Sequence, residues 1–275
     1  MLIKHIQVDD IIEVIREKTG TNLSGYRRQT IFKHISERMD DMHMSIDEYT
    51  KLCHVDEHEC RQLIKKVSIN VSLFFRNPVV FEILAQSVIP SLLENCKSEL
   101  RVWSAGCAAG QEPYSLAILI KEAIIKNGSS NLLPLIFATD IDSKILEKAQ
   151  KGVYDRNALK DTKLRIVDEC FSLKHNEFLI STDIKKMVHF SIDNLMSNLQ
   201  ASPAESVYGG FNLILCRNVL IYFSPEVQKT IQKKLTAALN PSGFLVLGRS
   251  ETISEILRSS FKIIDFRNRI YQKLQ

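Results

Sequence analysis

Apolar residues near the start of the chain recur at the spacing of an amphipathic helix. Ile11 and Ile15 are one helical turn apart, and so are Ile31 and Ile35. No stretch of this region alternates apolar with polar residues as a half-buried strand does. We therefore expect residues 1–72 to form an all-helical N-terminal domain.

Beyond Pro90 the pattern changes to short apolar runs that alternate with helical periods. The runs typical of strands are residues 100–104, 135–139, 187–191, 211–216 and 244–248, and the helical periods are 113–126, 143–151 and 225–239. Such alternation indicates a parallel sheet with helices on both faces. We expect residues 73–275 to form this α/β domain.

Two further segments depart from simple alternation. Residues 261–266 and 269–274 are short apolar runs on either side of a tight turn, which predicts an antiparallel hairpin at one edge of the sheet. The connection over about 163–186 is too long for a simple loop and contains a strand pattern at 177–182, so we expect a small β subdomain inserted there. The edge hairpin favours the class I methyltransferase version of a Rossmann-like sheet over the dehydrogenase version.

Residues 101–115 join a buried strand to a helix through a turn of small residues. Gly106, Ala108 and Gly110 have the G-x-[GA]-x-G spacing at which a backbone without bulky Cβ groups can approach a ligand, while the next helix offers its N-terminal amides. Plain tight connections have the same spacing, so this turn alone leaves a cofactor site and a structural turn open.

A carboxylate at the end of the next strand strengthens the cofactor interpretation. The strand at 135–139 ends in Asp140, and Rossmann-type sites place an acid there for ribose hydroxyls. Asp140 could instead cap the following helix. Asp142 and Ser143 could fill that role themselves, which would leave Asp140 for a ligand.

Composition is that of an ordinary globular protein. Of 275 residues, 45% are hydrophobic and 25% charged, and the net charge of +4 comes from basic residues scattered among acids, which argues against nucleic-acid binding. Six cysteines without a C-x-x-C pair, and the lack of a signal peptide or membrane-spanning run, predict reduced thiols and a cytoplasmic location. His54 and His58 have a spacing that zinc could use, but neighbouring acids favour a solvated helix face, so no metal is expected.

Four separated motifs, taken together, carry the strongest functional signal in the chain. They are N-V-S-L-F-F-R at 70–76, R-V-W-S-A-G-C-A-A-G-Q-E-P-Y-S at 101–115, A-T-D-I-D at 138–142 and C-R-N-V-L-I-Y-F at 216–223. Their residues and order resemble the CheR-type chemotaxis receptor methyltransferases, and the resemblance covers essentially the whole chain. It implies an enzyme that uses S-adenosylmethionine to esterify glutamate side chains on the cytoplasmic helices of methyl-accepting chemoreceptors, releasing S-adenosylhomocysteine. The enzyme would be a monomer without metal, and it would meet the membrane only through the receptor.

The resemblance also assigns roles to individual residues. It implies that Arg76 and Tyr222 are catalytic, because they would orient the acceptor carboxylate near the methyl group. The residues that it implies for cofactor binding are Asn70, Ser72, Arg76, Gly106, Glu112, Asp140, Asn194, Leu195, Cys216 and Arg217. Within this set, Glu112 suits the ammonium group of the cofactor and Asp140 suits its ribose.

Two expectations concern the receptor. Arg27, Arg28, Lys33 and Arg38 could share a helical face that meets the acidic receptor bundle, although a solvated face would have the same pattern. The predicted insert lacks, at 170–180, the glycine-containing loop that accompanies recognition of a receptor tail peptide in some relatives. We therefore expect such a peptide not to bind.

Two other functions fit parts of the pattern. A dinucleotide-dependent oxidoreductase would explain the turn and Asp140, but not Ala108 in place of the middle glycine, nor the edge hairpin. A binding module could keep the fold and lose methyl transfer. The presence of the residues that the resemblance assigns to the site argues against that loss; they are Arg76, Glu112, Asp140, Arg217 and Tyr222.

Overall fold

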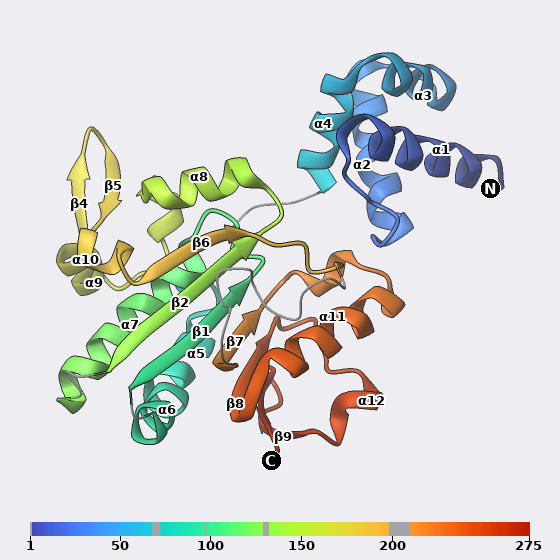
Figure 1. Ribbon diagram of the computed structural model, residues 1–275. Coiled ribbons are helices and arrows are strands. Elements are labelled where there is room, and N and C mark those ends of the chain that lie inside the picture. Colours follow the sequence, from blue (N-terminus) through green and yellow to red (C-terminus); the bar gives the residue numbers. More distant parts are fainter. Residues whose placement is uncertain (1, 68–71, 97, 129–131, 198–209) are drawn as a thin grey trace. The chain divides into compact units, whose positions relative to one another are not determined.

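The computed structural model describes residues 2–67, 72–96, 98–128, 132–197 and 210–275 (Figure 1). Contacts between Cα atoms divide the chain into two compact units. One unit comprises Met1–Asn70 with Tyr222–Gln228, and the other comprises Val71–Ile221 with Lys229–Gln275. None of the described helices is both long and apolar enough to span a bilayer.

The first unit is helical, as its apolar periodicity predicted. Its helices are α1 (Leu2–Thr19), α2 (Arg28–Met42), α3 (Ile46–Val55) and α4 (Glu57–Val67). Ile11, Ile15, Ile31 and Ile35 are fully buried. The residues that revealed the helical period are therefore the core of this unit.

A buried polar cluster joins three helices of this unit. The Arg38 guanidinium donates from Nε to Glu59 Oε1 (2.8 Å) and from Nη2 to Glu59 Oε2, while the Tyr49 hydroxyl donates to Glu59 Oε1 (2.7 Å). Glu59 is only 3% exposed. Arg38 is therefore turned into the unit rather than held on the cationic face that the sequence suggested. Arg28 remains at the surface, where it pairs with Asp9 (2.7 Å).

The second unit is built on a seven-stranded sheet of order β6-β2-β1-β7-β8-β10-β9. The strands are β1 (Glu99–Ala105), β2 (Leu133–Asp140), β6 (Val188–Ile192), β7 (Phe211–Cys216), β8 (Leu239–Leu247), β9 (Phe261–Asp265) and β10 (Ile270–Lys273). Neighbours from β6 to β8 are parallel, and β10 runs antiparallel to both β8 and β9. This is the strand arrangement of the class I methyltransferase sheet, and β9–β10 is the predicted edge hairpin.

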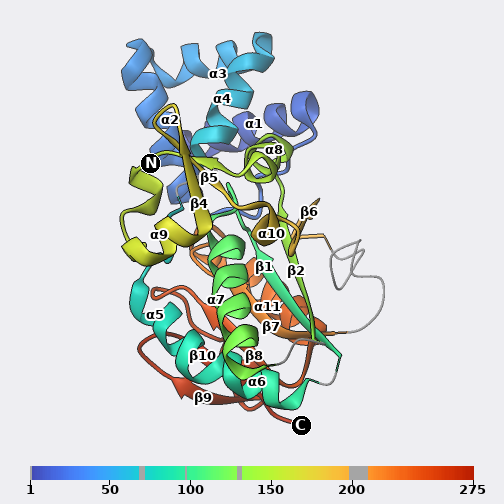
Figure 2. The ribbon, with the colours of Figure 1, turned by 90° about the vertical axis from the view of Figure 1, so that its left-hand side faces the viewer.

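Helices cover both faces of the sheet (Figures 1 and 2). They are α5 (Pro78–Ile83), a π-helical turn (Leu84–Val88), α6 (Ile89–Asn95), α7 (Gln111–Asn127), α8 (Ser143–Lys151), α11 (Pro225–Ala238) and α12 (Glu255–Arg258). Val102 and Leu213 share a core with α5, α6 and α7. Trp103 and Phe211 pack against each other on the opposite face, with tilted rings whose centroids lie 5.4 Å apart. From β1 the chain continues through α7 to β2, toward the β6 edge of the sheet, whereas from β7 it continues through α11 to β8, toward the β9 edge. Because both crossovers are right-handed, α7 and α11 lie on opposite faces.

Most predicted elements match the observed ones. The predicted bounds of α8 and β7 agree with the structure, and the other long elements differ by a few residues. The helices α5 and α6 and the π-helical turn between them were not predicted. The strand β8 begins at Leu239 rather than at 244, because Leu239 already pairs with Phe211 of β7. The pairing is then irregular, with Ser242 at φ 61°, until it resumes between Leu213 and Phe244.

A small three-stranded sheet lies in the connection between α8 and β6. Its order is β3-β5-β4, and the connection contains β3 (Val153–Tyr154), α9 (Leu164–Cys170), β4 (Phe171–Lys174), β5 (Glu177–Ile180) and α10 (Thr182–Lys185). His175 and Asn176 turn the β4–β5 hairpin with φ values of 46° and 67°, as a two-residue turn with both central residues left-handed requires. The small β insert of the predicted fold class is confirmed, and its sheet also includes β3.

Candidate functional site

The turn between β1 and α7 keeps bare backbone at the end of the sheet. Gly106 and Gly110 have φ values of +76° and +88°, which favour glycine. A Cβ atom at Gly106 would lie 2.5 Å from the side chain of Val219, and one at Gly110 would lie 2.9 Å from Cβ of Ala149. The Gly106 amide donates to the Thr139 carbonyl (2.8 Å), which fixes the turn to β2. Side chains are thus excluded at the two glycines where the sequence predicted that the backbone approaches a ligand closely.

Asp140 is held beside this turn at the end of β2. Its Oδ2 accepts the Ala108 amide (2.9 Å) and its Oδ1 accepts the Asp142 amide (3.1 Å). Burial raises the pKa of Asp140 above its ordinary value, and these amide contacts oppose the shift. Asp142 caps α8 by accepting from the Lys144 and Ile145 amides. The capping role predicted for Asp142 is therefore observed, whereas a ligand role for Asp140 stays a prediction.

Glu112 and Arg217 form a buried ion pair between α7 and the end of β7. The Arg217 Nη1 lies 3.2 Å from Glu112 Oε2, and Ser104 donates to Glu112 Oε1 (2.8 Å). The Arg217 Nη2 donates to the Arg76 carbonyl (2.8 Å) and to Asn77 Oδ1 (3.0 Å). Glu112 is 9% and Arg217 7% exposed. A cofactor ammonium at Glu112 would share this carboxylate with Arg217, which also fixes the backbone of Arg76.

The end of β6 completes the same edge of the sheet. The Asp193 amide donates to the Asp140 carbonyl (3.1 Å), and the Asp193 carboxylate pairs with Lys234 of α11 (3.2 Å). Lys234 also donates to the Asn194 carbonyl (3.4 Å). Leu195 is 8% exposed. The buried ion pair between Asp193 and Lys234 therefore fixes the start of the segment that contains Asn194 and Leu195.

Glu251, which sequence reasoning missed, organises the loop after β7. Its carboxylate accepts backbone N–H groups from Gly248 (2.5 Å), Asn218 (3.1 Å), Val219 (2.9 Å) and Ile221 (3.3 Å). Glu251 is 4% exposed. A Cβ at Gly248 would lie 2.6 Å from the backbone nitrogen of Asn218 and 2.5 Å from Glu251 Oε2, so glycine is required there.

This carboxylate connects the loop after β7 with the glycine turn. It holds the amide of Val219, whose side chain fills the space in which Gly106 has no Cβ. The signal that could have revealed Glu251 is an acidic residue shortly after a buried strand, preceded by Gly248. Cys216 lies fully buried at the start of the same loop, and burial raises the pKa of its thiol well above the ordinary value. This burial argues against thiolate chemistry at Cys216.

Most of the predicted cofactor residues lie at the carboxyl ends of the neighbouring strands β6, β2, β1 and β7. They are Gly106, Glu112, Asp140, Asn194, Leu195, Cys216 and Arg217. Ser72 is partly exposed and precedes the segment that Arg217 binds. Asn70 lies outside the described residues. Tyr222 belongs to the helical unit, where its carbonyl accepts the Arg27 amide (2.8 Å). The roles of all these residues stay predictions.

The strand ends suit a nucleoside ligand with a charged amino acid portion. The site offers two carboxylates, the glycine turn and the start of α7. Gln111 Oε1 and Arg217 Nε are buried without a hydrogen-bond partner in the described part of the chain, and a polar ligand would supply one. Among the described residues no group of three or more His, Cys, Asp and Glu side chains is arranged to hold a metal ion.

Comparison with known families gives a match over most of the chain. Residues 70–270 match the family described as "CheR methyltransferase, SAM binding domain". The chain is 31% identical over 258 residues to a chemotaxis protein methyltransferase of Borreliella burgdorferi, covering 90% of this chain and 88% of that protein. It is 34% identical over 218 residues to chemotaxis protein methyltransferase 1 of Vibrio cholerae, covering 77% and 75%.

Two further matches cover less of the relative's length or share lower sequence identity. An uncharacterized 104.1 kDa protein of Rhodobacter capsulatus is 31% identical over 268 residues, and the match spans 96% of this chain but 27% of that protein. Among solved structures, magnesium protoporphyrin IX methyltransferase of Synechocystis with bound SAM is 18% identical, with a TM-score of 0.37. That match covers 72% of this chain and 80% of the other.

Proposed function

The chain belongs to the CheR methyltransferase family, and from this premise we propose that it esterifies glutamate side chains of chemoreceptors with the methyl group of S-adenosylmethionine. The family match over residues 70–270 is the observation that carries the proposal. The residues gathered at the strand ends support it, because they suit the cofactor of this family. Family membership sets aside the oxidoreductase alternative.

The strand ends would bind the cofactor in parts. Asp140 would accept hydrogen bonds from the ribose hydroxyls, since its oxygens are held in place by two backbone amides. The buried Oε1 of Gln111 and the carboxylate of Glu112 would receive the ammonium group. Asn194 and Leu195 would border the adenine. When bound, the cofactor supplies a methyl group activated by its positively charged sulfur.

Arg76 and Tyr222 would orient the acceptor carboxylate. The backbone of Arg76 is fixed by Arg217, and Tyr222 follows the loop that Glu251 organises. A glutamate carboxylate is already ionised at neutral pH, so the enzyme needs no general base. Its contribution is positioning, which can supply ~7–11 kcal/mol in well-oriented systems. The Arg76 cation would also favour the ionised form of the acceptor.

The receptor side of the proposal is coarser. The named relatives are chemotaxis methyltransferases, which supports the cytoplasmic domain of a methyl-accepting receptor as the substrate. The enzyme would then act in the cytoplasm as a monomer, meeting the membrane only through its receptor. Binding of a receptor tail peptide is not part of the proposal, because the β4–β5 turn is formed by His175 and Asn176 without glycine.

Cofactor binding should be measured first because it needs no receptor. Calorimetric titration with S-adenosylhomocysteine should give saturable binding, while NAD in a parallel run should give none. Receptor-containing membranes with radiolabelled S-adenosylmethionine should then acquire base-labile methyl esters. Cofactor binding without any ester formation would contradict the proposed substrate.

The catalytic assignments need variants with a matched control. Arg76→Ala and Tyr222→Phe should each lower turnover about 100-fold with a much smaller change in S-adenosylhomocysteine affinity. Arg267→Ala, an exposed arginine in the β9–β10 turn, should change neither quantity. Normal methyl transfer by both Arg76→Ala and Tyr222→Phe would refute the assignments.

A further inference from the structure

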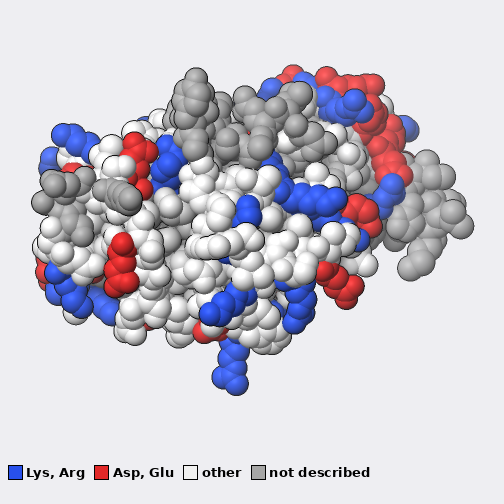
Figure 3. Space-filling model, turned by 60° about the horizontal axis from the view of Figure 1, so that its bottom comes forward, with Lys and Arg blue, Asp and Glu red and all other residues white. Residues whose placement is uncertain are grey.

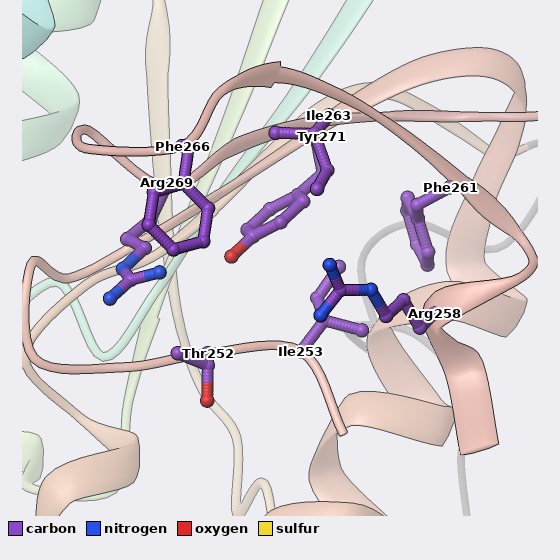
Figure 4. Close-up of a pocket in the computed structure, with 8 residues that line it drawn as sticks. All are labelled: Thr252, Ile253, Arg258, Phe261, Ile263, Phe266, Arg269 and Tyr271. Atoms are coloured by element: carbon purple, nitrogen blue, oxygen red, sulfur yellow. The ribbon is translucent and has the colours of Figure 1, made fainter. Parts of the chain in front are cut away.

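A solvent-open hollow lies on one face of the edge hairpin (Figure 4). We call it the C-terminal hollow and define it by five residues: Phe261, Ile263 and Tyr271 from the two strands, Arg258 of α12 and Arg269 of the hairpin turn. It is shallow and open to solvent. Every one of these residues belongs to the sheet unit, and none has a role in the cofactor site.

The apolar part of the C-terminal hollow comes from the strand register. Tyr271 of β10 is paired with Ile263 of β9, and Phe261 lies two positions before Ile263 on the same face. Tyr271 and Phe261 are buried, at 5% and 7% exposure, whereas Ile263 is 38% exposed. The hollow therefore has an aromatic floor and an apolar edge that water reaches.

Two arginine side chains border this floor. Figure 4 shows the guanidinium groups of Arg258 and Arg269 on either side of the Tyr271 ring. Neither arginine has a carboxylate within ion-pair distance among the described residues. Arg269 Nε donates to the Arg249 carbonyl (3.3 Å), and its guanidinium lies 4.8 Å from the centre of the Phe266 ring. The remaining guanidinium N–H groups leave capacity for an anion.

The backbone at Arg269 is unusual for such a large residue. Its φ of +57° lies in the left-handed region, which glycine adopts without the cost that a Cβ brings. Leu247 donates its amide to the Arg269 carbonyl (3.0 Å), which fixes this conformation against β8. A backbone hydrogen bond to β8 therefore anchors the residue that carries the guanidinium.

The surroundings are basic and expose apolar side chains. Residues 255–275 contain five Lys and Arg but only two Asp and Glu. Ile256 is 66% and Phe266 60% exposed. Figure 3 brings the bottom of the Figure 1 view forward and shows Lys and Arg side chains, with Asp and Glu side chains among them, on a mostly uncharged surface. In addition, β9 is the last strand of the sheet, so one of its backbone edges is unpaired within the described residues.

We propose that the C-terminal hollow binds an extended acidic peptide segment of a partner protein. A large apolar side chain of the segment would lie on Phe261 and Tyr271, and carboxylates on either side of it would pair with Arg258 and Arg269. The backbone of the segment would add to the free edge of β9. A peptide fits better than a small ligand that needs an enclosed cavity, because the hollow is open to solvent and Phe261 and Ile263 in its lining belong to the edge strand β9.

Synthetic peptides test the chemistry without a known partner. The probe is a fluorescein-labelled, end-capped peptide Glu-Asp-Glu-Phe-Asp-Glu, followed by fluorescence anisotropy with the full chain. We expect a dissociation constant of about 10–100 μM, weakening as salt is added. The neutral isostere Gln-Asn-Gln-Phe-Asn-Gln and the peptide with Ala for Phe should each bind at least about tenfold more weakly.

Variants locate the binding. Arg258→Glu should weaken the acidic peptide about tenfold or more, since Arg258 lies exposed on α12 and supports no other described contact. Arg267→Glu makes the same charge change in the same hairpin outside the hollow and should change the affinity less than about threefold. Unchanged S-adenosylhomocysteine affinity of both variants would show that they are folded, and it keeps this test separate from that of the proposed function.

Several outcomes would overturn the proposal. One is no anisotropy change up to about 1 mM protein. Equal weakening by Arg258→Glu and Arg267→Glu would show nonspecific attraction to a basic surface. Adenosine monophosphate or phenylpropionate competing at the concentration of the peptide would indicate a small-molecule site. Concentration-dependent dimerisation abolished by Arg258→Glu would assign the surface to a second copy of the chain.

Discussion

Replacing Glu251 tests how the loop after β7 is held. The carboxylate accepts four backbone N–H groups from the segments that follow β7 and β8. Glu251→Ala would leave these donors without their acceptor in a site that is 4% exposed. Glu251→Gln keeps the shape, but its NH₂ group would face two of the donors.

The expected cost follows from these contacts. An unsatisfied buried donor costs about 1–3 kcal/mol, and hydrogen bonds to a charged group are at the strong end. Burial raises the pKa of Glu251, so part of that benefit is offset by removing the charge from water. For Glu251→Ala we therefore expect a loss of about 3–5 kcal/mol in the free energy of unfolding, and for Glu251→Gln about 2–3 kcal/mol.

The assay combines urea unfolding with cofactor calorimetry. Glu255→Ala is the matched control, because Glu255 is an exposed acid in the first turn of α12, and it should change stability by less than about 0.5 kcal/mol. Below the unfolding transition, Glu251→Gln should also bind S-adenosylhomocysteine more weakly, because Val219 would no longer be held against Gly106. Wild-type stability and affinity in Glu251→Gln would refute the reasoning.

Three further predictions concern the strand ends. Burial raises the pKa of Asp140 in the folded protein, so the folded state binds the carboxyl proton more tightly than the unfolded state does. The stability that this proton contributes is fully present below about pH 3.9, the ordinary pKa of an Asp in the unfolded chain, and is lost as pH rises through the pKa of the folded protein. As pH rises above ~4, Asp140→Asn should therefore gain stability relative to the wild type in urea unfolding, and a constant difference would contradict this sign. Arg217→Met should cost about 3–5 kcal/mol by leaving Glu112 buried without its partner, whereas a loss below about 1 kcal/mol would mean that water replaces the pair. Gly110→Ala should cost more by thermal unfolding than Gly128→Ala, since both have φ > 0 but only Gly110 has a Cβ position blocked by a neighbour; equal costs would show that the turn relaxes.

The fold was largely predictable because its long elements have clear periods. The missed helices before β1 show where this reasoning fails. Pro90 is typical of a helix end, yet the π-helical turn Leu84–Val88 leads directly into α6 with Pro90 in its first turn. A proline is tolerated there. Local signals that usually separate two segments therefore fall inside one nearly continuous helical stretch.

The candidate site was only partly predictable. The position of Asp140 at the end of β2 was predictable because an acid that follows an apolar run is visible in the sequence. The cap of α8 was predictable because Asp142 directly precedes the helix. The ion pair between Glu112 and Arg217 joins positions 105 residues apart, a distance over which no local pattern acts. Glu251 was missed because its partners are backbone amides, which every residue carries except proline.

The order of strands in the sheet also bears on how quickly the protein can refold. The central strand β1 lies beside β7, and the Arg101 amide donates to Asn212 Oδ1 (2.9 Å) across 111 positions of sequence. Pairing of such distant segments gives a high contact order and slow folding, since much chain entropy is lost before the contacts form. The strand ends that would receive the cofactor meet only when this pairing is complete. Added cofactor should therefore slow unfolding of the finished sheet without accelerating its formation.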